Sequence, residues 1–244
     1  MRLAIGAVAA AMGALAMSSC GGSAAPVTAA APADSTAIVV LELEPLRAAP
    51  VYSKLPPAVR SLTDPLQHVK HLALCWNGKD LLMLAGGFSQ LPTGYTEIGK
   101  GIAAAGSGER IAAARKALSG GTPVVQQPQG VAEIRATVFG DGKLPLTGNL
   151  ANAGNLLRIA ATSTVTVHVE NEVELEIAAQ CVSSGKALQL EQSLRAMVTL
   201  ASAGTKDPAI STLLQEVRVQ RENILVRVRT VGSVEAFAKA LGAP

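Results

Sequence analysis

The most constraining feature of this sequence is a pair of alternating segments in its C-terminal third. Residues 164–169 read Thr-Val-Thr-Val-His-Val, and residues 173–181 alternate again after an Asn171-Glu172 pair. Alternation with a period of two residues is typical of strands that bury one face, so the two segments predict an antiparallel hairpin. Cys181 is in phase with the apolar residues of the second segment, which predicts that its side chain faces the core.

A helix and further short elements are expected after this hairpin. Ser183 or Ser184 is placed to cap a helix that runs to about Ala203, and Glu191 and Arg195 have the i, i+4 spacing of a stabilising ion pair. Asp207-Pro208 then opens a short helix. The remaining predicted elements are strands at 217–220 and 224–229, joined about Glu222-Asn223, and a helix over 234–241.

The N-terminal region predicts strands that are more hydrophobic. Residues 36–43 are β-branched and mostly apolar, and the prolines that follow keep the next helical segments short. Strands are also expected at 69–76 and 81–85, because Asn77-Gly78 between them is a strong hairpin signal. Both runs are apolar on both faces. This pattern predicts a central place in a sheet, beneath helices.

The middle of the chain predicts a smaller set of elements. Ser107 is a plausible cap for a helix over 109–118. The other elements expected here are a short strand over 102–105, a loop over 122–130, a strand over 131–139 and a helix over 148–158.

The predicted elements form a repeated order along the chain. Residues 36–85 and 173–230 both give strand, helical segment, Asp-Pro, strand, turn and strand. We therefore predict an α+β fold with antiparallel sheets and helices packed on one face, in two related halves at 35–160 and 161–244. The pattern leaves open whether the halves form two lobes or share one sheet.

The N-terminus predicts export and a lipid anchor. Residues 3–17 form an uncharged apolar run that is too short to span a membrane but typical of a secretory signal. The run ends in Met17-Ser18-Ser19-Cys20, which resembles the lipobox of bacterial lipoproteins, with Met17 where that family usually has leucine. The resemblance implies a signal peptide over 1–19 and acylation of Cys20. Residues 20–34 are small and include prolines, which predicts a flexible tether.

This resemblance implies a place in the bacterial cell envelope, with the membrane as a partner through the lipid anchor. Stable anchoring takes at least two acyl chains, and members of the family carry three. The expected location is the periplasmic face of the outer membrane or the cell surface, although the choice between inner and outer membrane stays open. Because the resemblance covers only about the first twenty residues, it constrains location and not activity.

Composition and motif searches argue against several function classes. The formal net charge is only +3, and the chain has one Trp, two Tyr and three Phe, so nucleic-acid binding is not expected. The three histidines do not match the spacing of a zinc site, and no metal or cofactor is expected. Ser183 and Lys186 fit the S-x-x-K motif of serine β-lactamases, but the companion motifs are missing. An envelope hydrolase that uses these two residues is therefore a remote alternative, and no catalytic residue is expected.

The charges of the C-terminal hairpins have two interpretations. One hairpin carries Glu170, Glu172, Glu174 and Glu176, and the other carries Arg218, Arg221, Arg227 and Arg229. In the favoured interpretation the hairpins lie side by side and these charges pair across the strands. In the alternative, the arginines form a strip that binds an anionic partner, such as a lipid headgroup or a surface polymer.

Two cysteines other than Cys20 also allow alternatives. Cys75 and Cys181 could form a disulfide in an exported protein. Because both lie in apolar strand patterns, the favoured expectation is that they are buried and free.

Taken together, these features favour a protein that binds and does not catalyse. The first hypothesis is an interaction module that docks on an envelope protein assembly. The alternative is a carrier of an apolar ligand or lipid. A solid core with an exposed apolar patch would favour the module, whereas an enclosed aliphatic cavity would favour the carrier.

Overall fold

The computed structural model describes residues 27–55, 57–120, 132–139 and 159–240. The predicted signal peptide, Cys20, the predicted loop over 122–130 and the predicted helix over 148–158 lie outside these residues.

The described elements are strands interspersed with helices. The strands are β1 (Ala37–Glu42), β2 (His71–Trp76), β3 (Leu81–Gly86), β4 (Thr96–Gly99), β5 (Ile102–Ala105), β6 (Ile134–Phe139), β7 (Ala160–Val169), β8 (Val173–Cys181), β9 (Arg218–Glu222) and β10 (Leu225–Gly232). The α-helices are α2 (Leu43–Ala48), α3 (Pro57–Thr63), α4 (Gly108–Gly120), α6 (Ser184–Gly204), α7 (Pro208–Gln215) and α8 (Val234–Ala240). Short 3-10 helices are η1 (Val27–Ala30), η2 (Tyr52–Lys54) and η3 (Asp64–Leu66).

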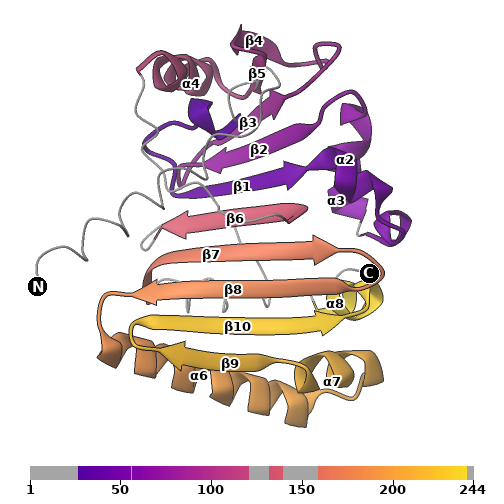
Figure 1. Ribbon diagram of the computed structural model, residues 1–244, viewed down its shortest axis with the longest axis vertical. Helices are drawn as coiled ribbons and strands as arrows, with labels where there is room; N and C mark the ends of the chain where they lie inside the picture. Colours follow the sequence, from indigo (N-terminus) through magenta and orange to yellow (C-terminus); the bar gives the residue numbers. More distant parts are fainter. Residues whose placement is uncertain (1–26, 56, 121–131, 140–158, 241–244) are drawn as a thin grey trace, which may run out of the picture.

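The ten strands form one continuous antiparallel sheet in the order β4-β5-β3-β2-β1-β6-β7-β8-β10-β9 (Figure 1). The predicted α+β class with antiparallel strands is confirmed. The two predicted halves share this sheet, because β6 pairs with β7 from Ile134↔Val167 to Phe139↔Thr162. The sequence had left this choice open.

Strands β1, β2 and β3 are buried on both faces. Ile38 and Val40 of β1 point to one face and Leu41 points to the other, and each is at most 4% exposed. The first face packs against α4 and η1, and the second packs against α2, α3 and η3. Leu72 and Ala73 of β2, and Leu84 and Ala85 of β3, divide between these two faces in the same way, so the central position beneath helices predicted for β2 and β3 is confirmed.

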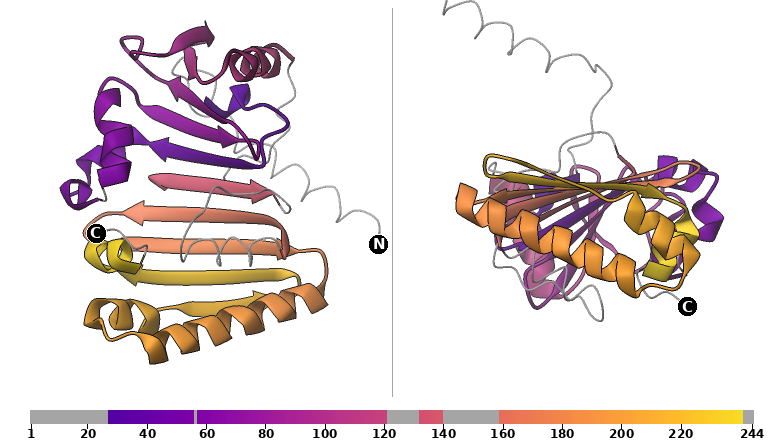
Figure 2. Two further views of the ribbon diagram at one scale, coloured as in Figure 1. Left: turned by 180° about the vertical axis from the view of Figure 1, so that it is seen from behind. Right: turned by 90° about the horizontal axis from the view of Figure 1, so that it is seen from below.

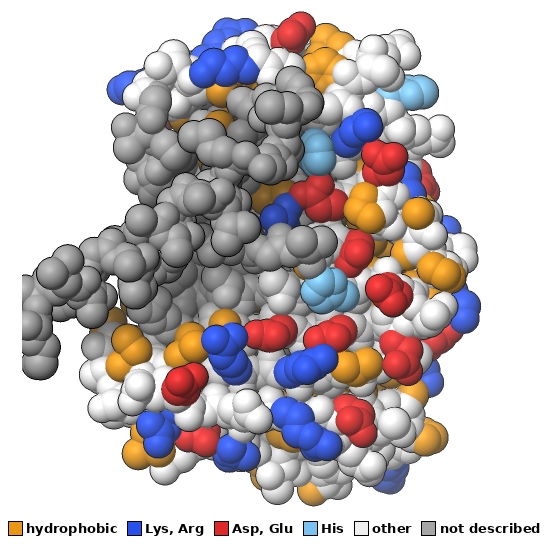
Figure 3. Space-filling view, viewed as in Figure 1, with side chains coloured by type: hydrophobic (Ala, Val, Ile, Leu, Met, Phe, Trp, Pro, Cys, Tyr) orange, Lys and Arg blue, Asp and Glu red, His pale blue; other side chains and the backbone are white. Residues whose placement is uncertain are grey.

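Among the described elements, helices cover one face of the C-terminal strands. Ala179 of β8 and Val226 of β10 share a buried cluster with Ala187 and Leu190 of α6. The side chain of Thr230 donates a hydrogen bond to the Leu213 carbonyl of α7 at 3.2 Å. Figure 2 shows α6, α7 and α8 on the same side of the sheet. The opposite face of these strands carries charged side chains (Figure 3).

Residues 36–85 and 173–230 each contain a strand, helical segments and two further strands, but the strands pair differently in the two segments. In the first segment the order across the sheet is β1-β2-β3, whereas in the second it is β8-β10-β9, and an internal repeat stays a prediction. The short helices after β1 return the chain directly beside that strand. By contrast, the 21-residue α6 and then α7 carry the chain past β8, so β9 enters at the edge and β10 returns between them.

The predicted tether needs a correction at its C-terminal end. The sequence predicted a flexible segment over 20–34, but Val27, Ala30 and Ala31 are at most 5% exposed and pack in the core. Alanine side chains are small enough to fit between α4 and the sheet. This packing could not be predicted from the composition of the segment. The strand β4 was also not predicted, because it is short and ends at Gly99.

Local predictions in the C-terminal third are confirmed. Ser183 is the N-cap of α6, and its hydroxyl oxygen accepts the backbone N–H of Lys186. Asp207 caps α7 in the same way. Cys75 and Cys181 are both free and buried, so the favoured expectation for the cysteines holds.

Candidate functional sites

The first candidate site is the charged face of β8 and β10. Arg227 Nη1 lies 3.1 Å from Glu176 Oε1, and Arg229 Nε lies 2.8 Å from Glu174 Oε1. Both pairs are diagonal, since Arg227 is directly opposite Ala178 in the ladder. Diagonal neighbours are within reach of side chains as long as arginine and glutamate. The predicted charge pairing across the strands is therefore present.

The four arginines do not form a single strip. Arg221 is opposite Val226 and so lies on the helix-covered face, where its Nε donates to Glu191 Oε2 at 3.0 Å. Arg195 of α6 donates to the other oxygen of Glu191. The hydrogen bond from Arg195 is the main cause that lowers the pKa of the Glu191 carboxyl, and the hydrogen bond from Arg221 lowers it further. Arg218 Nη2 lies 4.0 Å from Glu216 Oε2. Binding of an anionic partner by these arginines stays a prediction.

A second cluster joins β1, β2 and β6. His71 Nδ1 lies 2.5 Å from Glu42 Oε2, and Arg135 Nη2 donates to Glu42 Oε1. The hydrogen bond with Glu42 raises the pKa of His71, and the same bond lowers the pKa of Glu42. In the described part of the chain, no group of three or more His, Cys, Asp or Glu is arranged to hold a metal ion. The cluster is an ion-pair network in which Glu42 contacts both His71 and Arg135.

The geometry at Ser183 gives no support to the hydrolase alternative. Lys186 Nζ donates to Gln189 Oε1 at 3.3 Å, which directs the ammonium group along the helix and away from the serine hydroxyl. The hydroxyl itself is engaged in capping. A general base would have to lie within hydrogen-bond reach of the nucleophile.

A third candidate site is the outer side of α6. Met197 is 40% exposed and Leu200 is 73% exposed, whereas Leu190, two turns before Met197 in the same helix, is buried. Between Arg195 and Lys206 the chain carries no charged residue. We call residues 196–204 the α6 strip. Single exposed leucines are common, but several apolar residues on one uncharged helix surface are typical of a binding site.

Two depressions in the described surface are open to solvent. One of about 500 Å³ lies at the turn between β7 and β8, and one of about 490 Å³ lies beside α7 and α8. Four of the six side chains that line the first are acidic or histidine: His168, Glu170, Glu172 and Glu174. Neither depression resembles an enclosed aliphatic cavity.

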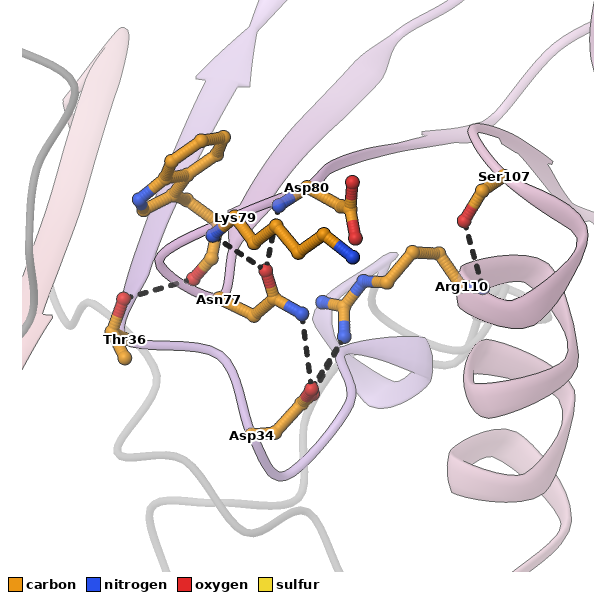
Figure 4. A network of polar contacts seen from close by, with 8 residues as sticks. Asp34, Thr36, Asn77, Lys79, Asp80, Ser107 and Arg110 are labelled. Atoms are coloured by element: carbon orange, nitrogen blue, oxygen red, sulfur yellow. Dashed lines mark hydrogen bonds and ion pairs between the residues drawn. The ribbon is translucent and has the colours of Figure 1, made fainter.

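The fourth candidate site is a polar cluster between the N-terminal segment and α4 (Figure 4). Arg110 is only 3% exposed, and its Nη1 lies 2.7 Å from both carboxylate oxygens of Asp34. Asn77 Nδ2 also donates to Asp34, at 3.3 Å, while Asn77 Oδ1 accepts the backbone N–H groups of Lys79 and Asp80. The hydrogen bond from Arg110 is the main cause that lowers the pKa of Asp34.

The contacts of this cluster could not be predicted from the sequence, because its members are far apart in the chain. One signal was available, since Arg110, Ala114 and Leu118 are spaced at i, i+4 and i+8. Ala114 and Leu118 are core residues of α4, so the same periodicity places Arg110 on the buried side of the helix.

Neither a protein-family model nor a curated protein sequence matches this chain. Its fold is similar to that of TP0453, a membrane lipoprotein of Treponema pallidum. Crystal form I of TP0453 aligns with a TM-score of 0.51 and 9% identity, over 91% of this chain and 98% of that chain. Crystal form III aligns with a TM-score of 0.50 and 8% identity, over 92% and 100%. At such low identity the likeness shows the fold alone.

No helix in the described ranges is long and apolar enough to cross a membrane.

Proposed function

We propose that this protein is a lipid-anchored interaction module of the bacterial cell envelope, which docks on another envelope protein through the α6 strip and does not catalyse a reaction. The anchor rests on the Met17–Cys20 sequence. The shared fold with a membrane lipoprotein is compatible with this location.

The observation that carries the proposal is the exposure of the α6 strip. Full burial of a leucine side chain is worth roughly 1.5–3 kcal/mol, so Leu200 leaves much of that free energy unused. Ala196 and Ala203 beside it are small and exposed, which lets a partner helix approach closely. Burial of this strip would desolvate no charged group.

The charges at its ends suggest the chemistry of the partner. Arg195 and Arg221 share the single carboxylate of Glu191, so this end of the strip has a net positive charge. Lys206 lies at the other end, roughly 16 Å away at the helical rise per residue. The partner we expect is an envelope protein with an aliphatic helix surface and acidic residues at that separation. Such complementary charges fix orientation and partner choice.

Other functions find less support. The two depressions described above are open to solvent and not enclosed, and the one at the β7–β8 turn is lined mainly by acidic and histidine side chains, which suits an apolar ligand poorly. Ser183 caps a helix, and Lys186 is directed to Gln189.

Native mass spectrometry of the full-length protein, gently extracted from its own membranes, tests the proposal. We expect an acylated N-terminus and one stoichiometric protein partner. Leu200→Glu should remove the partner and keep the acyl chains, while Gln192→Glu, an exposed change two turns before Leu200 and outside the α6 strip, should keep both. A partner that survives Leu200→Glu, or a bare acylated monomer, would overturn the docking site.

Cys20→Ser tests the anchor separately. This variant should leave the membrane fraction, because a chain without acyl groups has only its protein contacts to hold it there. Retention in the membrane fraction would show that the anchor is not at Cys20.

A further inference from the structure

Arg110 is an unusual residue in this fold because its charge is buried and only partly paired. Of its three nitrogens, only Nη1 has a partner; Nε and Nη2 are buried without a hydrogen bond. Nε and Nη2 form the edge of a guanidinium that binds a carboxylate with two parallel hydrogen bonds. Asp34 therefore contacts the guanidinium only at Nη1, and the edge formed by Nε and Nη2, which binds carboxylates best, has no hydrogen-bond partner. An ion pair selected only for stability would not be expected to leave these donors unsatisfied, since a buried donor without a hydrogen bond destabilises the fold.

The segment that carries Asp34 is weakly attached. We call residues 27–35 the strap. The two hydrogen bonds of its own backbone run from Ala31 N to Thr28 O and from Ser35 N to Pro32 O, so both stay within the strap. The first backbone bond to the sheet comes one residue later, from Thr36 N to Trp76 O at 2.7 Å. Within the described residues, the polar ties of the strap to the body are those of Asp34 with Arg110 and Asn77.

The strap covers an aliphatic surface. Val27 and Ala30 pack between α4 and the first strands, and removal of these small side chains would open an aliphatic groove that has Arg110 at one end. The walls of this groove are Ile38, Val40, Ala73, Cys75, Leu82, Leu84, Ala114 and Leu118, and all of them are at most 7% exposed with the strap in place. A cationic group at one end of an aliphatic groove is suited to a ligand with an anionic head and an alkyl chain.

From this arrangement we infer that the groove between α4 and the sheet is a binding site for a long-chain carboxylate, with Arg110 as its anion receptor and the strap as a competing occupant. The ligand head takes both Nε and Nη2 of Arg110, and its alkyl chain replaces Val27, Ala30 and Ala31 against the sheet. When the groove is closed, the carboxylate of Asp34 lies on the neighbouring Nη1, where its negative charge opposes a second carboxylate on the same guanidinium.

The chemistry of Asp34 fits the role of a competitor. Because Arg110 and Asn77 hold its pKa below the usual value, Asp34 is anionic at neutral pH and holds Arg110 only while the strap is seated. Its side chain is 58% exposed, so it returns to water at little cost when the strap leaves. Local opening near a chain terminus requires less free energy than global unfolding.

Titration calorimetry of the full chain with dodecanoate tests this site. We expect saturable one-to-one binding of dodecanoate and binding at least about tenfold weaker for dodecanol, which has the same chain without the charge. Asp34→Asn should tighten dodecanoate binding about tenfold, since it removes the competing charge. Asp80→Asn changes a nearby carboxylate that does not contact Arg110, and it should have no effect.

Two further measurements keep the test decisive. Arg110→Met should abolish the preference for dodecanoate over dodecanol, and its thermal unfolding reports whether it folds. Dodecanoate should also increase hydrogen exchange of the strap amides, whereas a ligand bound elsewhere would leave them unchanged. Equal binding of dodecanoate and dodecanol, or unchanged binding by Asp34→Asn, would overturn the inference. Leu200→Glu should not alter this binding, so failure here is separable from failure of the α6 docking proposal.

Discussion

The two ends of the sheet use the same type of strand in different ways. Strands β1, β2 and β3 are aliphatic on both faces, with α4 and η1 on one side and α2, α3 and η3 on the other. Strands β8 and β10 have helices on one face and ion pairs on the other. The pattern of apolar and polar residues along a strand therefore indicates whether one or both of its faces are covered by helices. The position of the strand in the sheet does not determine how many faces are covered.

The largest expected difference between the two regions comes from a buried charge. Ala73→Asp should destabilise the fold by on the order of 4 kcal/mol or more, because position 73 is fully buried within the β1–β3 sandwich. Ala178→Asp, on the charged face of β8 opposite Arg227, should cost less than about 1 kcal/mol. Chemical denaturation of the two variants checks this. Similar losses would mean that the outer face of β8 is as buried as β2.

Truncation of core leucines should sharpen the comparison. Leu84→Ala removes side-chain volume between two covered faces that cannot easily collapse, and we expect a loss near the upper end of about 2–5 kcal/mol. Leu190 is a residue of α6 that packs against the sheet. Because this helix can shift toward the sheet when the side chain is shortened, we expect a loss near the lower end for Leu190→Ala. Urea unfolding of both variants measures the difference. The reverse order would show that α6 is the more rigidly packed layer.

The ion pairs on the outer face should contribute little. A double-mutant cycle with Arg229→Gln and Glu174→Gln should give a coupling free energy of about 0.2–1 kcal/mol, since the arginine is 59% exposed. The coupling should fall when salt is added. A value several times larger, unaffected by salt, would mean that this face is shielded from solvent.

The smallest expected effect is the pH dependence of the pair between His71 and Glu42. Since the pKa of His71 is raised above 6.5, its contribution to stability is complete below that pH and is lost as pH rises through the raised pKa. Because the pKa of Glu42 is lowered, the contribution of its carboxylate to stability is complete above pH 4.5 and is lost as pH falls through the lowered pKa. We expect no more than about 0.5 kcal/mol, because His71 is 46% exposed and screened by water.

Unfolding free energies of the wild type and His71→Gln between pH 6 and pH 9 measure this effect. The difference between them should shrink as pH rises. A difference that is constant over this range would show that the ionised pair does not stabilise the fold.

The sequence allowed local structure to be predicted where the signal lies within a few residues. The hairpins β2–β3, β7–β8 and β9–β10 follow from alternation and from turns such as Asn77-Gly78, and Gly78 indeed has a positive φ of 93°. The cap at Ser183 is equally local. These features depend on steric and hydrogen-bonding preferences that each short segment carries by itself.

Long-range partners could not be predicted in this way. The pairing of Ala37 with Val138 joins residues about a hundred positions apart, and the insertion of β10 between β8 and β9 depends on the path of two helices. The same holds for Arg110, whose partner Asp34 is 76 residues away. A single sequence contains the periodicity that buries this arginine but not the identity of the group that meets it.

The two outermost strands, β4 and β9, affect whether copies of this protein can join edge to edge when they are crowded together. An open sheet edge can recruit a strand from another molecule, and β9 presents Arg218, Arg221 and Glu222 along this edge. At the other edge, β4 is only four residues long and has an irregular register between Glu97 and Gly99. Both edges therefore discourage sheet-to-sheet polymerisation. Under the proposed lipid anchor, many copies held in one membrane plane would remain separate molecules, each with its helices available for the proposed partner.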